Sequence, residues 1–210
     1  MEVFLISLLT SVLGSLMGII VILFIEHKRL PSLRISTNQE VHSDERYGPG
    51  HVHTNERWKF FRVAVRNESL PGLLRWLTRQ TAENCHATIE VTLETGEALY
   101  TMRGRWVATP QLPHIPQEAI VKLLHPDPVS IRAGDTEALD VFTKREGDPE
   151  AYGWNNEAYL NDWRTPEYRL NLGTYNARIT IKSQNGVSNA KLFVLEIRET
   201  IESSSIRGAD

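Results

Sequence analysis

Cysteine is almost missing from this sequence of 210 residues, which contains Cys85 and no other. A single cysteine cannot form a disulfide within the chain, so a folded domain must be held by its hydrophobic core, as is usual in reducing compartments. The sequence also lacks a P-loop, a dinucleotide-binding fingerprint, a Cys-x-x-Cys pair and a nucleophile elbow. These absences remove the catalytic classes that short motifs identify. We therefore expect no enzyme and no cofactor.

An excess of one charge is lacking as well. Two of the 26 acidic residues, Glu2 and Glu26, lie in the first 26 residues, which contain no Lys or Arg. The rest of the chain carries 23 basic and 24 acidic residues, which are interspersed. Nucleic-acid binding would require a basic face. The charge balance therefore predicts no nucleic-acid partner.

A long apolar run is present at residues 3–25, which are 23 consecutive residues without a charge. A helix of that length spans the roughly 30 Å of a bilayer core. A core helix is a weaker interpretation because the run is apolar on every face. A cleaved signal peptide would need a basic start and small residues at its end, whereas this run ends in Phe24-Ile25-Glu26. Residues 1–26 are therefore predicted to be a retained transmembrane anchor, in contact with membrane lipid.

The basic residues next to the anchor predict its orientation. Lys28, Arg29 and Arg34 follow the apolar run, and no Lys or Arg precedes it. Positive charge near a spanning helix favours the cytoplasmic side. We expect a single-pass membrane protein whose C-terminal domain is cytoplasmic.

One face of the predicted helix carries small side chains. They recur at helical spacing and include a Gly-x-x-x-Gly pair: Ser7, Ser11, Gly14, Ser15 and Gly18. Small residues let two helices approach closely in lipid. The alternative is that Gly and Ser are simply common in spanning helices. The face is a candidate for self-association or for contact with another membrane protein.

Residues 27–198 are predicted to form one β domain. The clearest strand is 58–67, where Phe61, Val63 and Val65 alternate with Arg62, Ala64 and Arg66; this is typical of a strand with one solvated face. Other short strands are separated by turn signals, at 30–36, 84–93, 99–107, 129–132, 138–142, 174–182 and 190–197. Residues 69–80 indicate a short helical turn, and 119–124 fit either a strand or a helix. Residues 199–210 are predicted to be a disordered polar tail.

Two long connections, at about 37–57 and 144–167, are candidate recognition loops, because sandwiches present loops at their ends. Their aromatic residues are of the kind that anchor interfaces. The alternative is that these rings pack against the edge of the domain itself. The candidates are Tyr47, Tyr152, Trp154, Tyr159 and Trp163.

The segment Asn171-Leu172-Gly173-Thr174-Tyr175-Asn176-Ala177 resembles the D-x-G-x-Y-x-C segment of immunoglobulin-like domains. The strand at 63–67, with its Asn turn and the later 87–89 strand, also resembles the opening of such modules. Ala177 stands where the family has a disulfide cysteine, so the resemblance is to disulfide-free immunoglobulin-like and fibronectin-like modules. It implies an antiparallel Greek-key β-sandwich in which Tyr175 forms a tyrosine corner.

Other constellations favour structural roles. His42, His51 and His53 are scattered along a polar loop, and we expect no metal site there. Cys85 and His86 are adjacent in a strand, so they face opposite sides and Cys85 belongs to the core. The sequence Asn67-Glu68-Ser69 matches a glycosylation sequon. A cationic strip is the less favoured interpretation of Arg62, Arg66, Arg103 and Arg105.

The sequence therefore predicts a single-pass membrane protein that displays a β-sandwich as a binding or scaffolding module. One alternative is an accessory subunit of a membrane complex, packed through the Gly/Ser helix face. A second alternative is a membrane-tethered enzyme with its site in the loops.

Overall fold

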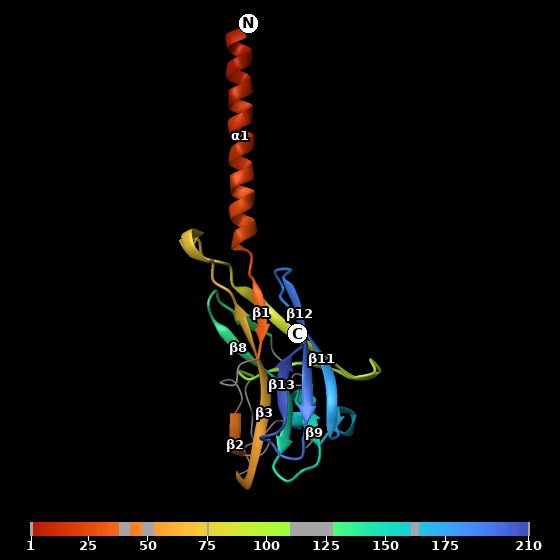
Figure 1. The fold of residues 1–210 in the computed structure, drawn as a ribbon. Helices are drawn as coiled ribbons and strands as arrows, with labels where there is room; N and C mark the ends of the chain where they lie inside the picture. Colours follow the sequence, from red (N-terminus) through yellow and green to blue (C-terminus); the bar gives the residue numbers. More distant parts are fainter. Residues whose placement is uncertain are drawn as a thin grey trace.

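The computed structural model describes residues 2–37, 43–47, 53–74, 76–109, 128–160 and 164–209. It is mainly β, with two antiparallel sheets and one long helix, α1 (Glu2–Arg29), which stands clear of the sheets (Figure 1). Helix α1 has basic residues in its last turn, where they complement the helix dipole, and it ends shortly before Pro31. Its part Thr10–Arg29 is long and apolar enough to cross a membrane.

The larger sheet has seven strands. Its order is β1-β3-β8-β9-β10, with β2 paired to β3 and β6 paired to β8. The strands are β1 (Leu33–Ser36), β2 (Ser43–Tyr47), β3 (His53–Asn67), β6 (Arg105–Trp106), β8 (Thr136–Arg145), β9 (Ala151–Gly153) and β10 (Arg169–Leu170).

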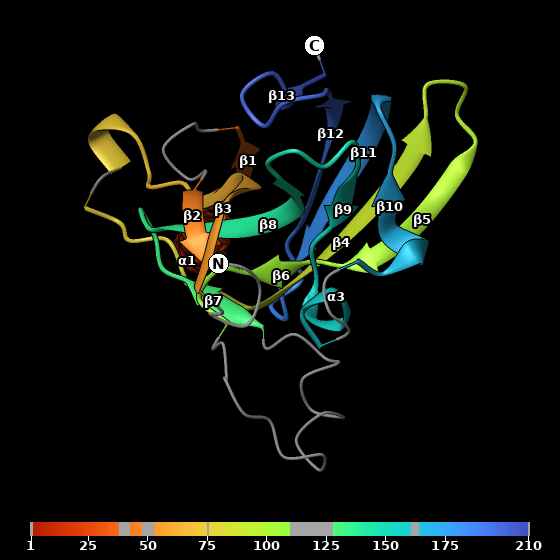
Figure 2. The same ribbon diagram turned by 90° about the horizontal axis from the view of Figure 1, so that it is seen from below.

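The smaller sheet has six strands in the order β13-β12-β11-β4-β5, with β7 paired to β4. Figure 2 views both sheets from the end opposite α1. The strands are β4 (Ala82–Leu93), β5 (Ala98–Arg103), β7 (Val129–Ile131), β11 (Gly173–Lys182), β12 (Ser188–Ile197) and β13 (Ser205–Gly208). Among the described residues, three short helical segments join strands: η3 (Gly72–Leu74), α3 (Asn156–Leu160) and η4 (Pro166–Tyr168).

The main core lies between the two sheets and follows the predicted alternation. Phe61, Val63 and Val65 of β3 are buried, and the Phe61 ring stacks on Phe142 of β8 with centroids 4.2 Å apart. The opposite sheet contributes the alternating apolar residues of β4, β11 and β12 to the same cluster, and Cys85 is among them. The predicted core positions of these strands and of Cys85 are confirmed.

The sequence predicted that the other face of the seven-stranded sheet is exposed to solvent, but much of this face is buried. Arg62 and Ala64 are buried there, and only Arg66 is exposed as expected. A second apolar cluster lies on this face. It consists of Trp58 and Phe60 of β3 and of Tyr152, Trp154 and Ala158 from the chain after β8. Arg62 extends to Asp140 on the neighbouring strand, with Nε and Oδ1 2.7 Å apart. The sheet is thus covered on both faces in this region.

One expectation about an irregular segment is wrong. The described part of the tail, 199–209, is not disordered, because β13 pairs with the outer edge of β12 and both Ile201 and Ile206 are buried. The two long connections contain more regular structure than predicted: 144–167 includes the end of β8, then β9, α3 and η4, and β2 lies within 37–57. The helical turn predicted in 69–80 is present as η3. The segment 119–124 lies outside the described residues.

Gly104 marks the point where the chain leaves one sheet and enters the other. It stands between β5 and β6, and its N–H donates a hydrogen bond to the Ala87 carbonyl at 2.9 Å. A Cβ at this position would lie 2.7 Å from the Ala87 side chain and 2.9 Å from the Leu139 side chain. These two neighbours belong to different sheets, so neither can move away freely.

We predict that Gly104→Ala destabilises the domain by about 1–3 kcal/mol, because the added methyl group overpacks the space between the sheets. Gly208→Ala is the matched control, since its Cβ would make ordinary contacts at 3.6 Å with Lys191. Urea denaturation of both variants measures the difference. Equal unfolding midpoints for the two variants would contradict the tight crossover.

Candidate functional site

The junction between α1 and the domain is held by hydrogen bonds. The Gln80 N–H donates to the Arg29 carbonyl at 2.7 Å. The Arg79 guanidinium donates through Nη1 to the carbonyls of Leu30 at 2.8 Å and Lys28 at 3.2 Å. The last carbonyls of a helix have no partner within the helix. The segment before β4 therefore caps α1, and the helix is bonded to the domain and does not hang on a free linker.

Asn67 connects four segments beneath this junction. Its side-chain oxygen accepts from the Ser32 N–H at 3.0 Å, and its Nδ2 donates to the carbonyls of Gln80 at 2.9 Å and Ile131 at 3.0 Å. Its own carbonyl accepts from the Gly134 N–H at 2.7 Å. The residue is fully buried. Its amide thereby joins the chain after α1, the end of β3, the capping segment and β7.

The burial of Asn67 shows that the sequon Asn67-Glu68-Ser69 is not accessible for glycosylation in the folded domain. Glycosylation attaches a bulky group to the side-chain amide, which here is enclosed and bonded on both its oxygen and its nitrogen. The folded domain therefore cannot carry a glycan at this position. The Asn is explained by its hydrogen bonds.

The small face of α1 is open along its described part. Cβ atoms built at Gly14 and Gly18 would meet nothing within 4 Å. The Ser15 hydroxyl donates back to the Ser11 carbonyl at 2.9 Å, which satisfies its polar group within the helix. The side chain of Ser7 lies outside the described residues. The four others form one continuous strip that a second helix could approach.

Two of the five aromatic residues predicted as loop contacts are described with their side chains, and both are buried. Tyr152 and Trp154 are 7% and 1% exposed and belong to the second cluster, where Trp154 meets Phe60 edge-on. The expectation that they anchor a surface contact is wrong, because they cover the domain's own sheet. The side chains of Tyr47 and Tyr159, and the whole of Trp163, lie outside the described residues.

Tyr175 has a local bond of the tyrosine-corner type. Its hydroxyl donates to the carbonyl of Asn171, four residues upstream, at 3.0 Å. Burial raises the pKa of this hydroxyl. The bond fixes the turn that leads into β11.

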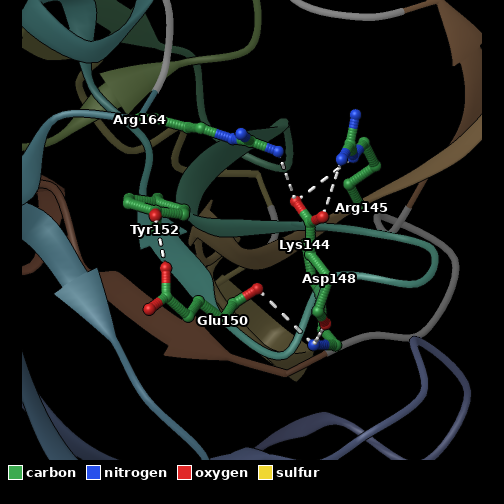
Figure 3. Close-up of polar contacts among 6 residues, drawn as sticks. All are labelled: Lys144, Arg145, Asp148, Glu150, Tyr152 and Arg164. Atoms are coloured by element: carbon green, nitrogen blue, oxygen red, sulfur yellow. Dashed lines mark hydrogen bonds and ion pairs between the residues drawn. The ribbon is translucent and has the colours of Figure 1, made fainter.

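A cluster of polar side chains closes the turn between β8 and β9 (Figure 3). Asp148 is held by two guanidinium groups, from Arg145 at 2.7 Å and from Arg164 at 3.0 Å. The Nζ of Lys144 donates to the backbone carbonyls of Asp148 and Glu150. Glu150 accepts from the Tyr152 hydroxyl and lies 3.6 Å from Arg169. Each of these groups is bonded to another member of the cluster or to the turn itself.

The chemistry available in this cluster is limited by those bonds. Burial lowers the pKa of Lys144, and the nearby Asp148 and Glu150 counteract the shift. Burial and the bond to Glu150 raise the pKa of Tyr152 to about 12, so its hydroxyl stays protonated. A buried amine of lowered pKa could act as a nucleophile only if a substrate reached it. Here the amine is fully buried and faces two carbonyls, which is a structural arrangement.

The remaining reactive residues do not gather into a site. Burial raises the pKa of the Cys85 thiol to about 11, which suppresses its thiolate at neutral pH. Within the described part of the chain, no group of three or more His, Cys, Asp or Glu side chains could hold a metal ion. Arg66 and Arg103 are exposed on different sheets, whereas Arg62 and Arg105 are buried. The structure does not assemble the four into a cationic strip.

A shallow depression lies on the β11–β12 pair of the smaller sheet. It has a volume of about 270 Å³ and is lined by Arg178, Ala190, Lys191 and Leu192. Leu192 is 45% exposed and is the cross-strand partner of Arg178, so an apolar and a cationic side chain lie side by side there. This lining suits a surface contact with a partner and contains no acid–base pair.

The sequence did not indicate the residues that organise the junction. Asn67 was interpreted as part of a sequon, and Arg79 and Gln80 as part of a helical turn. Their partners are backbone groups far away in the sequence, such as the Ile131 carbonyl. The Asn67 turn at the end of a strand was the single signal available.

Comparison with known proteins gives little. No family model matches the sequence, and no curated protein matches it either. One solved structure, of a Bordetella pertussis protein assigned provisionally as ApaA, is similar with a TM-score of 0.30 and 12% identity, over 82% of this chain and 98% of that one. A likeness this weak carries no argument about fold or function.

We predict that Asn67→Ala destabilises the domain by at least about 2 kcal/mol, because it removes a fully buried side chain that bonds the Ser32 N–H and the carbonyls of Gln80 and Ile131, the last of them buried. Asn171→Ala is the matched control: its side chain is exposed and its bonded carbonyl is kept, so the change should stay within about 0.5 kcal/mol. Thermal and urea unfolding of both variants test this. An Asn67→Ala domain as stable as the control would disprove the junction role.

Proposed function

We propose that this protein is a single-pass membrane protein that holds a non-catalytic β-sandwich at the bilayer surface as a binding or scaffolding module. The observation that supports the proposal best is the exposure of α1. Ten large apolar side chains between Val12 and Phe24 are 50–65% exposed and point to all sides of the helix. Such a surface is unstable in water and suited to lipid.

The junction supports the same function. A helix end capped by Arg79 and Gln80 holds the sandwich at a fixed position next to the membrane. Restricting a module to a membrane raises its effective concentration for membrane-bound partners. The depression lined by Arg178 and Leu192 is a described surface that suits such a partner.

The finer assignments belong to the proposal. We assign the sandwich to the Greek-key immunoglobulin-like class, supported by its two packed antiparallel sheets and by the Tyr175 bond. We place it on the cytoplasmic side, supported by Lys28 and Arg29 in the last turn of α1. Protease protection of a C-terminal tag in sealed membranes reports this orientation.

Membrane integration is tested on the full chain. Leu16→Arg with Ile20→Arg puts two charges in the middle of the helix, at a cost of about 5–7 kcal/mol for insertion. We expect the unmodified chain to stay with membranes in alkaline carbonate and to float with lipid, and the double-Arg variant to do neither.

The matched control is Leu16→Val with Ile20→Val, which keeps the helix apolar and should behave like the unmodified chain. Release of the unmodified chain into the carbonate supernatant would refute the membrane anchor. Retention of the double-Arg variant would show that another part of the chain holds it on the membrane.

A second candidate function is an accessory subunit that packs against another spanning helix. The observation in its favour is the open strip at Gly14 and Gly18. It would use the same anchor, with a helix as partner.

We predict that Gly14→Ile with Gly18→Ile weakens helix association in membranes, because the added side chains keep the two backbones apart. Val12→Ile with Leu16→Ile is the control on the other faces. Energy transfer between labelled chains in vesicles measures self-association, and mass spectrometry after mild detergent extraction detects a different partner. Unchanged association and unchanged partners in the Gly variant would remove the accessory-subunit function.

A further inference from the structure

The turn after β3 exposes a large aromatic side chain beside α1. We call it the Trp76 turn and define it by Pro71, Gly72, Leu74, Trp76 and Leu77. Trp76 is 73% exposed, more than any other large apolar side chain in the described part of the chain. The turn is ordered by backbone hydrogen bonds from Leu74 to Pro71 at 3.3 Å and from Leu77 to Leu74 at 2.9 Å. Its exposed tryptophan has no role in the fold described above.

The position of the turn relative to α1 is fixed by the junction. Gln80, whose N–H bonds the Arg29 carbonyl, is four residues after Trp76. Even a fully extended chain places Trp76 within about 14 Å of Gln80. Figure 1 shows η3 at the end of the domain that faces α1, next to the end of the helix.

The depth of the turn follows from the length of the helix. Arg29 lies four residues beyond Ile25, the last residue of the apolar run, which is a rise of about 6 Å. The headgroup layer extends about 5–8 Å beyond the hydrocarbon core on each side. If residues 3–25 span the core, Arg29 lies among the headgroups, and the segment bonded to it lies at the same level.

The chemistry of the surroundings suits that layer. Tryptophan has an apolar ring and an N–H donor, and it is enriched where lipid meets water. The nearby Lys28 can attract lipid phosphates, and the adjacent carboxylate of Glu26 is paired with Arg29 at 3.1 Å. Leu30, between helix and domain, is 38% exposed and adds apolar surface.

We propose that the Trp76 turn is a second membrane contact, which inserts the Trp76 side chain into the lipid interface of the bilayer that α1 spans. This proposal rests on the proposed anchor and adds a second point of attachment to it. Two contacts on the same bilayer restrict the tilt of α1 and the sandwich bonded to it, because a single spanning helix can tilt within the bilayer.

The test uses the full chain in phosphatidylcholine vesicles, with brominated phosphatidylcholine as quencher in the lipid and acrylamide as quencher in water. The signal of Trp76 is the difference in fluorescence between the unmodified chain and Trp76→Phe, which cancels the other tryptophans. We expect brominated lipid to quench this signal strongly, and acrylamide to quench it much less in vesicles than free tryptophan.

The control moves the tryptophan to the opposite end of the sandwich. Leu172 is 48% exposed and lies just before β11. The ten residues of β11 separate it by about 34 Å from the β11–β12 hairpin, which lies near the junction because Asn185 donates to the Thr81 carbonyl. In Trp76→Phe with Leu172→Trp, the new signal should respond to acrylamide and not to brominated lipid.

A Trp76 signal that acrylamide quenches and brominated lipid does not would overturn the proposal, since the turn would then lie in water. A signal protected from both quenchers would overturn it as well, and would indicate a contact with a second copy. Flotation of the same vesicles distinguishes failure of the proposed anchor from failure of the second membrane contact. A chain that fails to float refutes the anchor, whereas a chain that floats with an unquenched Trp76 refutes the second contact alone.

Discussion

The hydrogen bonds that link α1 to the sandwich are the constraint on which the rest of the structure depends. The buried Asn67 side chain bonds the chain after α1 and β7 to the end of β3. Gln80 and Arg79 then bond the carbonyls at the end of the helix. Buried polar groups of this kind are costly unless every one is bonded, so the arrangement has little freedom to slip. The same bonds that complete the domain also fix the end of α1.

The seven-stranded sheet shows how far charge can be buried when its partners are in place. Arg62 and Asp140 lie on neighbouring strands with Nε and Oδ1 2.7 Å apart, and the guanidinium also lies over the Phe60 ring. Lys144 is fully buried and donates to two carbonyls of the turn that follows it. Such pairs add little net stability over apolar residues, but breaking one leaves an unpaired buried charge. Lys144 thereby holds the turn that leads from β8 into β9, the next strand of the same sheet.

Period-two alternation was sufficient to predict the main core, because Val63, Ile89 and Ile179 each lie on the buried face of an alternating strand. It failed on the outer face, where Arg62 and Ala64 have the pattern of a solvated surface. The apolar cluster on that face includes Trp154 and its neighbours, which come from almost a hundred residues further along the chain. The tail was missed for a similar reason: Ile201 and Ile206 are too few for a pattern, and only the free edge of β12 gives them a place. Asn67 shows this limit of sequence-based prediction best, because no local pattern distinguishes an Asn that is buried and hydrogen-bonded from an exposed Asn that accepts a glycan.

A bonded junction also changes what an associating helix could do. A flexible linker would let two sandwiches rotate independently of their anchors. Here the Arg29 carbonyl is bonded to Gln80, so the rotation of α1 about its axis is tied to the orientation of the sandwich. If the strip at Gly14 and Gly18 meets a second copy, the geometry of that contact sets which faces of the two domains oppose each other. The surface around Leu192 would then be turned toward or away from the partner domain by residues of α1.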